Sequence, residues 1–221
     1  MHRFVVIEGI DGSGKSTQYR LLCERLAAEG HDFRKLVFPR YDNPSSALIR
    51  MYLNGEFGSH PSDVSAYAAS AFFAVDRYAS YKTVWHDDYH SGRLILSDRY
   101  TTSNAVHQGS KLPADALEDY LAWLRDFEFR RMELPEPDLV LYLDVDAETS
   151  LAQLRSRESA TNTHADIHEQ DAEYLRDCVR TGRYAADYFG WTRIRCLNPD
   201  GGMRTIEEIH EELYAAVKGV L

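Results

Sequence analysis

The segment at residues 9–16 constrains the fold more than any other part of the chain. It reads GIDGSGKS and matches the pattern G-x-x-x-x-G-K-[ST]. A short β-branched run, RFVVIE at 3–8, precedes it, and a stretch with helical spacing at 15–28 follows it. A glycine-rich turn between a buried strand and a helix directs backbone N–H groups at phosphate oxygens. The segment therefore predicts a phosphate-binding P-loop.

The rest of the chain alternates between strand-like and helix-like segments. Further strands are expected at 33–38, 94–97, 139–143 and 192–197, and further helices at 44–53, 62–89, 113–132, 147–157, 168–189 and 204–217. Such alternation is typical of βαβ units and a parallel sheet. We expect an α/β protein with the three-layer P-loop NTPase fold, in which helices flank a mostly parallel sheet of five strands.

No linker or internal repeat divides the 221 residues, so a single domain over 1–221 is expected. The small polar stretch 159–165, SATNTHA, predicts a loop, and we expect a short lid over about 155–170.

The charge and hydropathy of the chain restrict its partners. The formal net charge of -10 disfavours binding to a nucleic-acid polymer. No apolar run approaches the roughly 20 residues needed to cross a bilayer, so a cytoplasmic protein without a membrane contact is expected. Three widely spaced cysteines match no metal pattern. An anionic substrate would need positive side chains gathered in a cleft.

Charged residues follow the predicted strands. In an open parallel sheet, ligands bind at the carboxyl ends of the strands. Lys15 is placed to reach the β- and γ-phosphates of a nucleotide, and Ser16 to ligate Mg²⁺. Asp98 is placed to support that metal. Arg40 and Arg99 suit a second phosphate, because a guanidinium binds phosphate bidentately.

Two further groups lie on predicted helices. Phe73 and Arg77 are four residues apart and share a helix face, so they could stack on a base and grip its phosphate. Arg155 and Arg157 end a helix just before the polar loop and could close over a transferring phosphoryl group.

Structural roles remain open for each of these side chains. Phe73 could be a core residue, Arg40 a solvated surface residue, and Asp98 with Arg99 a structural ion pair. The arginines before the polar loop could stabilise a helix C-terminus.

Several segments together resemble the thymidylate kinase family. They are FVVIEGIDGSGKSTQ at 4–18, FPRY at 38–41, FFAVDR at 72–77, DRYTTSNAVHQG at 98–109 and PDLVLYLDV at 137–145. They occur in the order and rough spacing of that family, over about residues 3–190. The resemblance implies transfer of the γ-phosphoryl group of ATP to dTMP, with Mg²⁺ as cofactor, in a homodimer.

The resemblance also implies roles for individual residues. The catalytic residues would be Lys15, Asp11, Arg99 and Arg157. ATP would be bound by Gly9, Ile10, Asp11, Gly12, Ser13, Gly14, Lys15, Ser16, Thr17 and Arg155. The dTMP site would comprise Asp11, Arg40, Phe73, Arg77, Arg99, Asn104, His107 and Gln108. The metal site would comprise Ser16, Asp98 and Glu169, with Asp166 beside it. The peptide bond between Phe38 and Pro39 is implied to be cis.

The chain departs from the family pattern at two places. His107 stands where the family often has a Tyr that helps to exclude a 2′-hydroxyl. Ser13 stands where some members carry a basic residue, and members without one usually supply basic groups from the lid. The stretch 159–165 has no Lys or Arg, so Arg155 and Arg157 must serve.

Three other functions compete with this interpretation. A deoxynucleoside kinase would need a base for a sugar hydroxyl and fewer arginines for an acceptor phosphate. A GTPase would need the motif Asn-Lys-x-Asp, which does not occur in the sequence. A non-catalytic nucleotide-binding module would not need the complete P-loop, Asp98 and Arg99.

Overall fold

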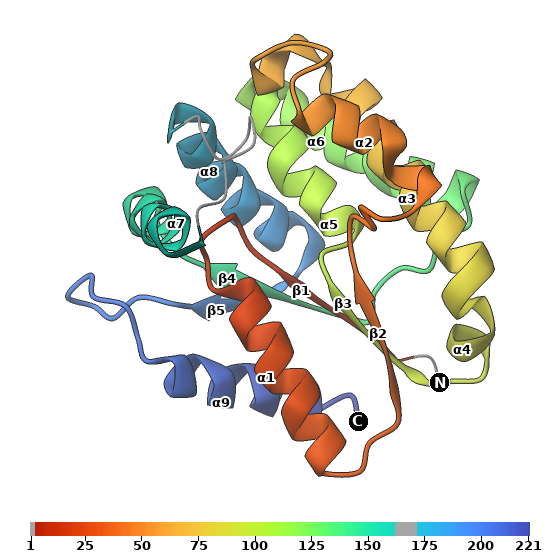
Figure 1. Ribbon diagram of the computed structural model, residues 1–221, viewed down its shortest axis with the longest axis vertical. Helices are drawn as coiled ribbons and strands as arrows, with labels where there is room; N and C mark the ends of the chain where they lie inside the picture. Colours follow the sequence, from red (N-terminus) through yellow and green to blue (C-terminus); the bar gives the residue numbers. More distant parts are fainter. Residues whose placement is uncertain (1–2, 162–171) are drawn as a thin grey trace.

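Five parallel strands form the central sheet, in the order β2-β3-β1-β4-β5 (Figure 1). The computed structural model describes residues 3–161 and 172–221, and side chains at 3–156 and 172–221. The strands are β1 (Arg3–Glu8), β2 (Phe33–Val37), β3 (Leu94–Asp98), β4 (Leu139–Asp144) and β5 (Thr192–Arg195). The predicted parallel sheet is confirmed. β5 ends earlier than expected because Leu197 pairs antiparallel with Met203, outside the sheet.

Helices cover both faces of the sheet and complete the three layers (Figure 1). On one face lie α1 (Lys15–Ala28) and α9 (Ile206–Lys218). On the other lie α3 (Ala66–Ser80), α4 (His86–His90), α5 (Thr101–Ser103), α6 (Ala114–Arg125) and α8 (Ala172–Phe189). Two more helices, α2 (Ala47–Leu53) and α7 (Ala147–Thr161), lie near the carboxyl ends of the strands.

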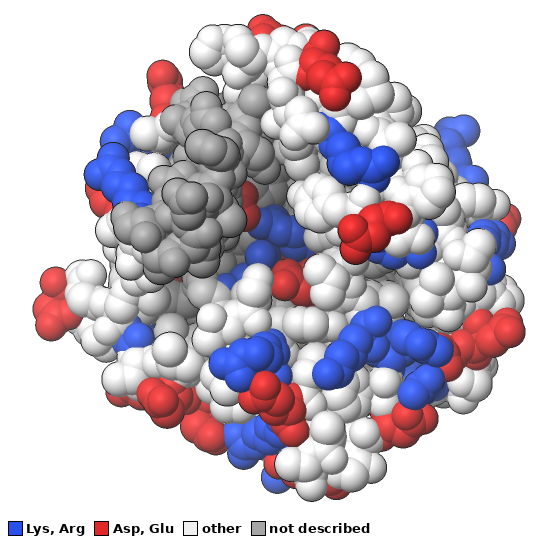
Figure 2. All heavy atoms as spheres, viewed as in Figure 1, with Lys and Arg blue, Asp and Glu red and all other residues white. Residues whose placement is uncertain are grey.

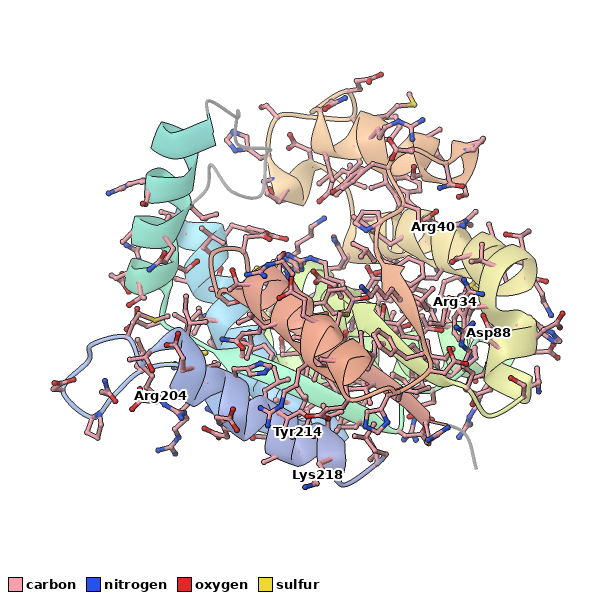
Figure 3. The ribbon with its side chains drawn as sticks, turned by 60° about the horizontal axis from the view of Figure 1, so that its bottom comes forward. Arg34, Arg40, Asp88, Arg204, Tyr214 and Lys218 are labelled. Atoms are coloured by element: carbon pink, nitrogen blue, oxygen red, sulfur yellow. The ribbon has the colours of Figure 1, made fainter. Side chains whose placement is uncertain are left out.

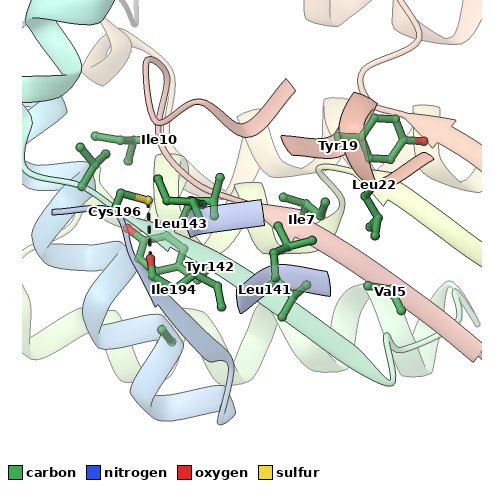
Figure 4. Close-up of a cluster of buried hydrophobic side chains, with 14 of the residues drawn as sticks. Val5, Ile7, Ile10, Tyr19, Leu22, Leu141, Tyr142, Leu143, Ile194 and Cys196 are labelled. Carbon is green, nitrogen blue, oxygen red and sulfur yellow. Dashed lines mark hydrogen bonds between the residues drawn. The ribbon is translucent and has the colours of Figure 1, made fainter. Parts of the chain in front are cut away.

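The alternation of side chains along β1 explains the two cores. Val5 and Ile7 point to the α1 and α9 face, where they join a large buried cluster with Leu22 (Figure 4). Phe4 and Val6 point to the opposite face and pack with residues such as Trp85. Both faces of the strand are fully buried, as expected for a parallel sheet covered on two sides.

The predicted helices differ from the structure at their ends. The expected helix at 62–89 begins at Ala66, because the side chain of Ser65 accepts from the backbone N–H of Ala68 at 3.2 Å. A widened π turn at Tyr81–Trp85 separates α3 from α4. α9 begins two residues later than expected, because Thr205 and Glu208 form a capping box.

Two regions depart further from expectation. The helix predicted over 147–157 continues to Thr161, so the first part of the expected polar loop is helical. The stretch after β3 is also helical, from α5 through a π turn at Asn104–Gln108 to a 3-10 turn at Gly109–Lys111, and no element was predicted there.

The carboxyl ends of β1, β2, β3 and β4 lie at one edge of the sheet, below α2, α3 and α7 (Figure 1). The Phe38–Pro39 peptide bond at this edge is cis, as the resemblance implied. Within the described residues, no helix is both long and apolar enough to span a bilayer.

Candidate active site

A cavity of about 430 Å³ opens above the carboxyl ends of the strands. Its walls come from the P-loop, the ends of β2 and β3, the helix α3, the turn at 104–108 and the helix α7. Figure 2 shows Lys and Arg atoms, with a few acidic ones among them, at the bottom of a hollow near the middle of this face. Predicted site residues that line the cavity are Ile10, Asp11, Gly12, Ser13, Gly14, Lys15, Ser16, Thr17, Phe73, Arg77, Asp98, Arg99, Asn104, His107 and Gln108.

The P-loop takes the conformation that its glycines predict. Gly12 and Gly14 have φ angles of 77° and 84°, in the left-handed region that side chains disfavour. A Cβ at Gly12 would also lie 2.5 Å from the carbonyl oxygen of Ser150 on α7. The hydroxyl of Ser150 donates to the carbonyl oxygen of Asp11, so the loop is attached to the start of α7.

Lys15, Ser16 and Asp98 meet where the P-loop enters α1. Nζ of Lys15 lies 3.4 Å from Oδ1 of Asp98, and the Ser16 hydroxyl donates to Oδ2 of Asp98 at 3.3 Å. Oδ1 of Asp98 is buried and accepts no hydrogen bond from the described residues.

These oxygens fit a hard divalent cation, because Mg²⁺ prefers hydroxyl, carboxylate and phosphate oxygens. The described part of the chain contains no cluster of three or more acidic, His or Cys residues that could hold a metal by itself. Among the described residues, Ser16 and Asp98 would hold such an ion.

Arg99 follows β3, beside the P-loop, in a strained backbone conformation. Its φ of 68° is unusual for a residue with a side chain. One end of its guanidinium donates to the carboxylate of Asp11, and Nη1 lies 3.5 Å from Oε1 of Glu8. Burial lowers the pKa of Arg99, but the charges of Asp11 and Glu8 more than offset this effect and raise the pKa above its usual value.

Glu8 supports this arrangement from the end of β1. Its carboxylate is completely buried and accepts from the hydroxyls of Thr102 at 2.6 Å and Ser103 at 2.7 Å. The backbone N–H of Gly9 donates to it at 2.9 Å. The sequence offered Glu8 only as part of a family pattern, and no local signal identifies its distant partners.

Arg77 lies at the other end of the cavity, in a buried ion pair with Glu128. Nε and Nη2 of Arg77 donate to the two oxygens of Glu128 at 2.7 and 2.6 Å. Thr101 and Asn104 also donate to this carboxylate, at 2.7 and 2.9 Å. Sequence reasoning missed Glu128, which looks like an ordinary charged residue of an amphipathic helix.

Phe73 and two amide side chains line the same end. Phe73 is half-buried and packs with the edge of the Tyr52 ring, 6.4 Å between centroids. The sequence left open whether Phe73 is a core residue, and it has both a core contact and a cavity contact. Oε1 of Gln108 is buried without a hydrogen-bond partner among the described residues. Phe73, Asn104 and Gln108 thus offer a flat apolar surface beside polar amide groups.

Arg40 does not line the cavity. Its Nε lies 3.5 Å from the carboxylate of Asp76 on α3, and its Nη2 donates to Ser45 at 3.3 Å. In Figure 3 Arg40 lies beside α3, beyond the end of β2. Its backbone N–H also donates to Asp76, at 2.8 Å. Its chain neighbours Pro39 and Tyr41 line the cavity, so Arg40 lies at the rim, and its role toward a phosphate stays a prediction.

The predicted lid residues are only partly described. Arg155 is exposed on α7 and does not line the cavity, whereas its neighbours Gln153 and Leu154 do. The side chains of Arg157, Asp166 and Glu169 lie outside the described residues.

His107 is buried beside Arg99, and its ring faces the cavity. Burial, followed by the charge of Arg99, lowers its pKa to about 3. The imidazole is therefore neutral at physiological pH.

Comparison with known proteins agrees with this geometry. The family model for thymidylate kinase matches residues 7–185. The thymidylate kinase of Mycobacterium tuberculosis is 35% identical over 191 residues, which cover 85% of this chain and 86% of the relative. A probable thymidylate kinase of Pyrococcus horikoshii is 29% identical over 216 residues, 97% of this chain and 95% of the relative.

A solved structure shares the fold. The structure of thymidylate kinase from Candida albicans superposes with a TM-score of 0.71 at 22% identity, and the match covers 99% of this chain and 92% of that one. The P-loop, the cavity above it and the family match over most of the chain lead to one assignment. The chain belongs to the thymidylate kinase family.

Proposed function

We propose that the protein transfers the γ-phosphoryl group of ATP to dTMP and gives ADP and dTDP. The observation that carries this proposal is one cavity that joins the P-loop with Lys15 at one end to Phe73 and Arg77 at the other. Such a cavity suits two nucleotides with their phosphates facing each other.

The reaction needs positioning and charge neutralisation more than proton transfer. The phosphate of dTMP is already anionic at neutral pH, so one of its oxygens can attack the γ-phosphorus without a base while the bond to the β-phosphate oxygen breaks. Lys15 would offset the charge on the transferring group. Mg²⁺ near Ser16 and Asp98, with Glu169 as a further candidate ligand, would supply additional charge neutralisation when bound.

Arg99 is the proposed anchor of the acceptor phosphate. Its side chain is 15% exposed toward the cavity, and it is held by Asp11 and Glu8. Arg40 could join it only after leaving Asp76. The proposed lid covers about residues 155–170 of the single domain. Arg155 and Arg157 remain its proposed cations, and they would face the phosphates of ATP.

The thymine is proposed to stack on Phe73, beside Arg77, Asn104 and Gln108. Arg77 uses two donor groups on Glu128, and its Nη1 is 3.3 Å from the carbonyl oxygen of Tyr100. Asn104 gives its amide N–H to Glu128 and to the carbonyl oxygen of Ser70. The polar groups at this end are thus fixed before a ligand binds, which favours selectivity.

We also propose a cytoplasmic homodimer. Large apolar side chains are exposed along α3, where Tyr67, Val75 and Tyr78 are 41%, 50% and 40% exposed. Sedimentation at several concentrations would test this, and a monomer at micromolar concentration would contradict it.

A coupled assay of ADP release over a panel of nucleoside monophosphates, with thymidine included, tests the proposed reaction. We expect dTMP to be the preferred acceptor. Preference for thymidine would favour a deoxynucleoside kinase, and no ADP with any acceptor would favour a non-catalytic module. Lys15→Ala should abolish turnover and keep the fold. Lys35→Ala, on the exposed side of β2, should leave turnover unchanged.

A further inference from the structure

The contact between Arg99 and His107 determines where the imidazole proton lies. Nη1 of Arg99 is 3.1 Å from Nε2 of His107. A guanidinium has donors and no acceptor, so this contact forms only while Nε2 is unprotonated and accepts. A neutral imidazole that accepts at Nε2 carries its proton on Nδ1.

The other side of the ring faces a partner that suits this tautomer. Nδ1 of His107 lies 3.7 Å from Sγ of Cys178 on α8, and the sulfur can accept its proton. Burial raises the pKa of Cys178 to about 12, so the group is a thiol. The thiol donates to the hydroxyl of Ser110 at 3.4 Å, and that hydroxyl donates to the carbonyl oxygen of His107 at 2.9 Å.

These contacts form a closed ring of hydrogen bonds around His107. Each donor meets an acceptor only if the proton is on Nδ1. The hydroxyl of Tyr174 adds a second bond to the carbonyl oxygen of His107, at 2.8 Å. These hydrogen bonds connect α8 to the turn at 104–108 and leave Nε2 of His107 pointing at Arg99.

We propose that His107 is a positioning residue for Arg99, and that Cys178 holds its imidazole in the Nδ1-protonated tautomer. The proposal rests on the assignment of Arg99 to the acceptor phosphate. It gives Cys178, which the mechanism does not otherwise use, a role in aligning the acceptor.

A neutral acceptor suits this place better than a charged one. Arg99 already faces the carboxylates of Glu8 and Asp11. A third carboxylate would add negative charge beside the proposed phosphate site, and an imidazolium would repel the guanidinium. The neutral ring fixes the direction of Nη1 and leaves the net charge unchanged.

The charged groups around the imidazole keep it neutral over the working pH range. Burial disfavours the imidazolium most, and the charges of Arg99, Lys15 and Lys111 oppose it, while Asp11 favours it. Cys178 and Tyr174 also face the ring. The contact with Arg99 therefore persists from about pH 5 to pH 8, well above the lowered pKa.

Nitrogen-15 NMR of the histidine rings in the full chain tests the tautomer without any substrate. We expect the His107 signals, assigned by their loss in His107→Gln, to show a protonated Nδ1 and an unprotonated Nε2 that do not change between pH 5 and pH 8. A protonated Nε2, or titration near pH 6.5, would overturn the proposal. This readout does not depend on which reaction the protein catalyses.

Kinetics with paired variants test the effect on Arg99. His107→Leu should raise the KM for dTMP or lower kcat about tenfold, with the KM for ATP unchanged, and His107→Gln should recover most of the loss because its amide oxygen can accept from Arg99.

The variants of Cys178 test its effect on the imidazole. Cys178→Ala should reduce the fraction of the Nδ1-protonated tautomer, whereas Cys178→Ser should retain it. Equal loss in His107→Leu and His107→Gln, or an unchanged tautomer in Cys178→Ala, would contradict the assigned roles.

Discussion

Two arginines among the described residues line the cavity, and they are held in different ways. Arg77, at the end of the cavity proposed for the base (the base end), is 2% exposed and forms a bidentate pair with Glu128, which is completely buried. Arg99 at the phosphate end is 15% exposed and shares its contacts among Asp11, Glu8 and His107. The first arrangement resembles part of a core, and the second remains accessible to a ligand.

This difference predicts different consequences of mutation. Loss of one partner of a buried ion pair leaves an uncompensated charge in a low dielectric, so stability falls. Loss of one of several partners of a partly exposed arginine costs little stability, because the remaining partners and water compensate. We therefore expect the base end to be sensitive in stability and the phosphate end in turnover.

Glu128→Gln should have the largest effect on stability. It leaves the Arg77 guanidinium buried without a counter-charge, and we expect a loss of about 3–5 kcal/mol in the free energy of unfolding. Urea denaturation measures this. Glu136→Gln, which breaks an exposed ion pair with Arg125, is the matched control and should cost less than about 1 kcal/mol. A loss of similar size in both variants would remove the distinction.

Asp11→Asn should separate turnover from stability at the phosphate end. We expect kcat/KM for dTMP to fall on the order of 100-fold, because Arg99 loses a charged partner that orients it. The free energy of unfolding should fall by on the order of 1 kcal/mol, less than in Glu128→Gln, because Glu8 still pairs with Arg99 and the Asn side chain can still accept. Asp42→Asn, in an exposed loop, should affect neither quantity. A large loss of stability in Asp11→Asn would make the two ends alike.

Phe73→Ala should weaken dTMP binding by about 1–3 kcal/mol, because a base loses its stacking surface. Binding of ATP should change much less, since its phosphates contact the P-loop. Titration calorimetry with each nucleotide measures both effects. Phe72→Ala is the matched control, because Phe72 is half-buried but does not line the cavity. Equal weakening of both nucleotides would return Phe73 to a purely structural role.

Lys111→Met should give the smallest of these effects. The quantity that changes is the pH dependence of the free energy of unfolding. Nζ of Lys111 donates to the hydroxyl of Tyr52 at 2.7 Å and to the carbonyl oxygen of Val64 at 3.1 Å. Burial lowers the pKa of Lys111 to about 7 in the folded protein. Above that pH the amine is neutral in the folded protein but still protonated in the unfolded chain, so the free energy of unfolding rises with pH. This gain in stability is lost as pH falls toward 7.

The measurement is the difference in unfolding free energy between wild type and Lys111→Met at pH 7 and pH 8.5. It should shift in favour of the wild type by on the order of 1 kcal/mol at the higher pH. The cysteines and tyrosines titrate alike in both proteins and cancel in the difference. A constant difference would mean that Lys111 keeps its ordinary pKa in the folded protein.

The sequence predicts the sheet and the P-loop because their signals are local. Buried parallel strands are short apolar runs, and the phosphate loop is a contiguous motif whose glycines adopt left-handed backbone angles. The Phe38–Pro39 geometry followed from the family resemblance, and the structure agrees with it. The helical turns at 101–111 escaped prediction because polar side chains are buried there by hydrogen bonding, without an apolar period.

The carboxylates that organise the site could not be predicted, because their partners are distant in the sequence. Glu128 lies 51 residues from Arg77, and Glu8 lies 94 residues from Thr102. Nothing in a local pattern distinguishes such residues from solvated ones. The contact of Arg40 with Asp76, 36 residues away, could not be predicted for the same reason.

Asp11 contacts two separate parts of the molecule, one through its backbone and one through its side chain. Its carbonyl oxygen receives the hydroxyl of Ser150 in the first turn of α7, and its carboxylate receives Arg99. A displacement of the first turn of α7 would shift the backbone of Asp11 and, with it, the carboxylate that Arg99 contacts. α7 and Arg99, from two different walls of the cavity, are thus connected through one residue of the P-loop.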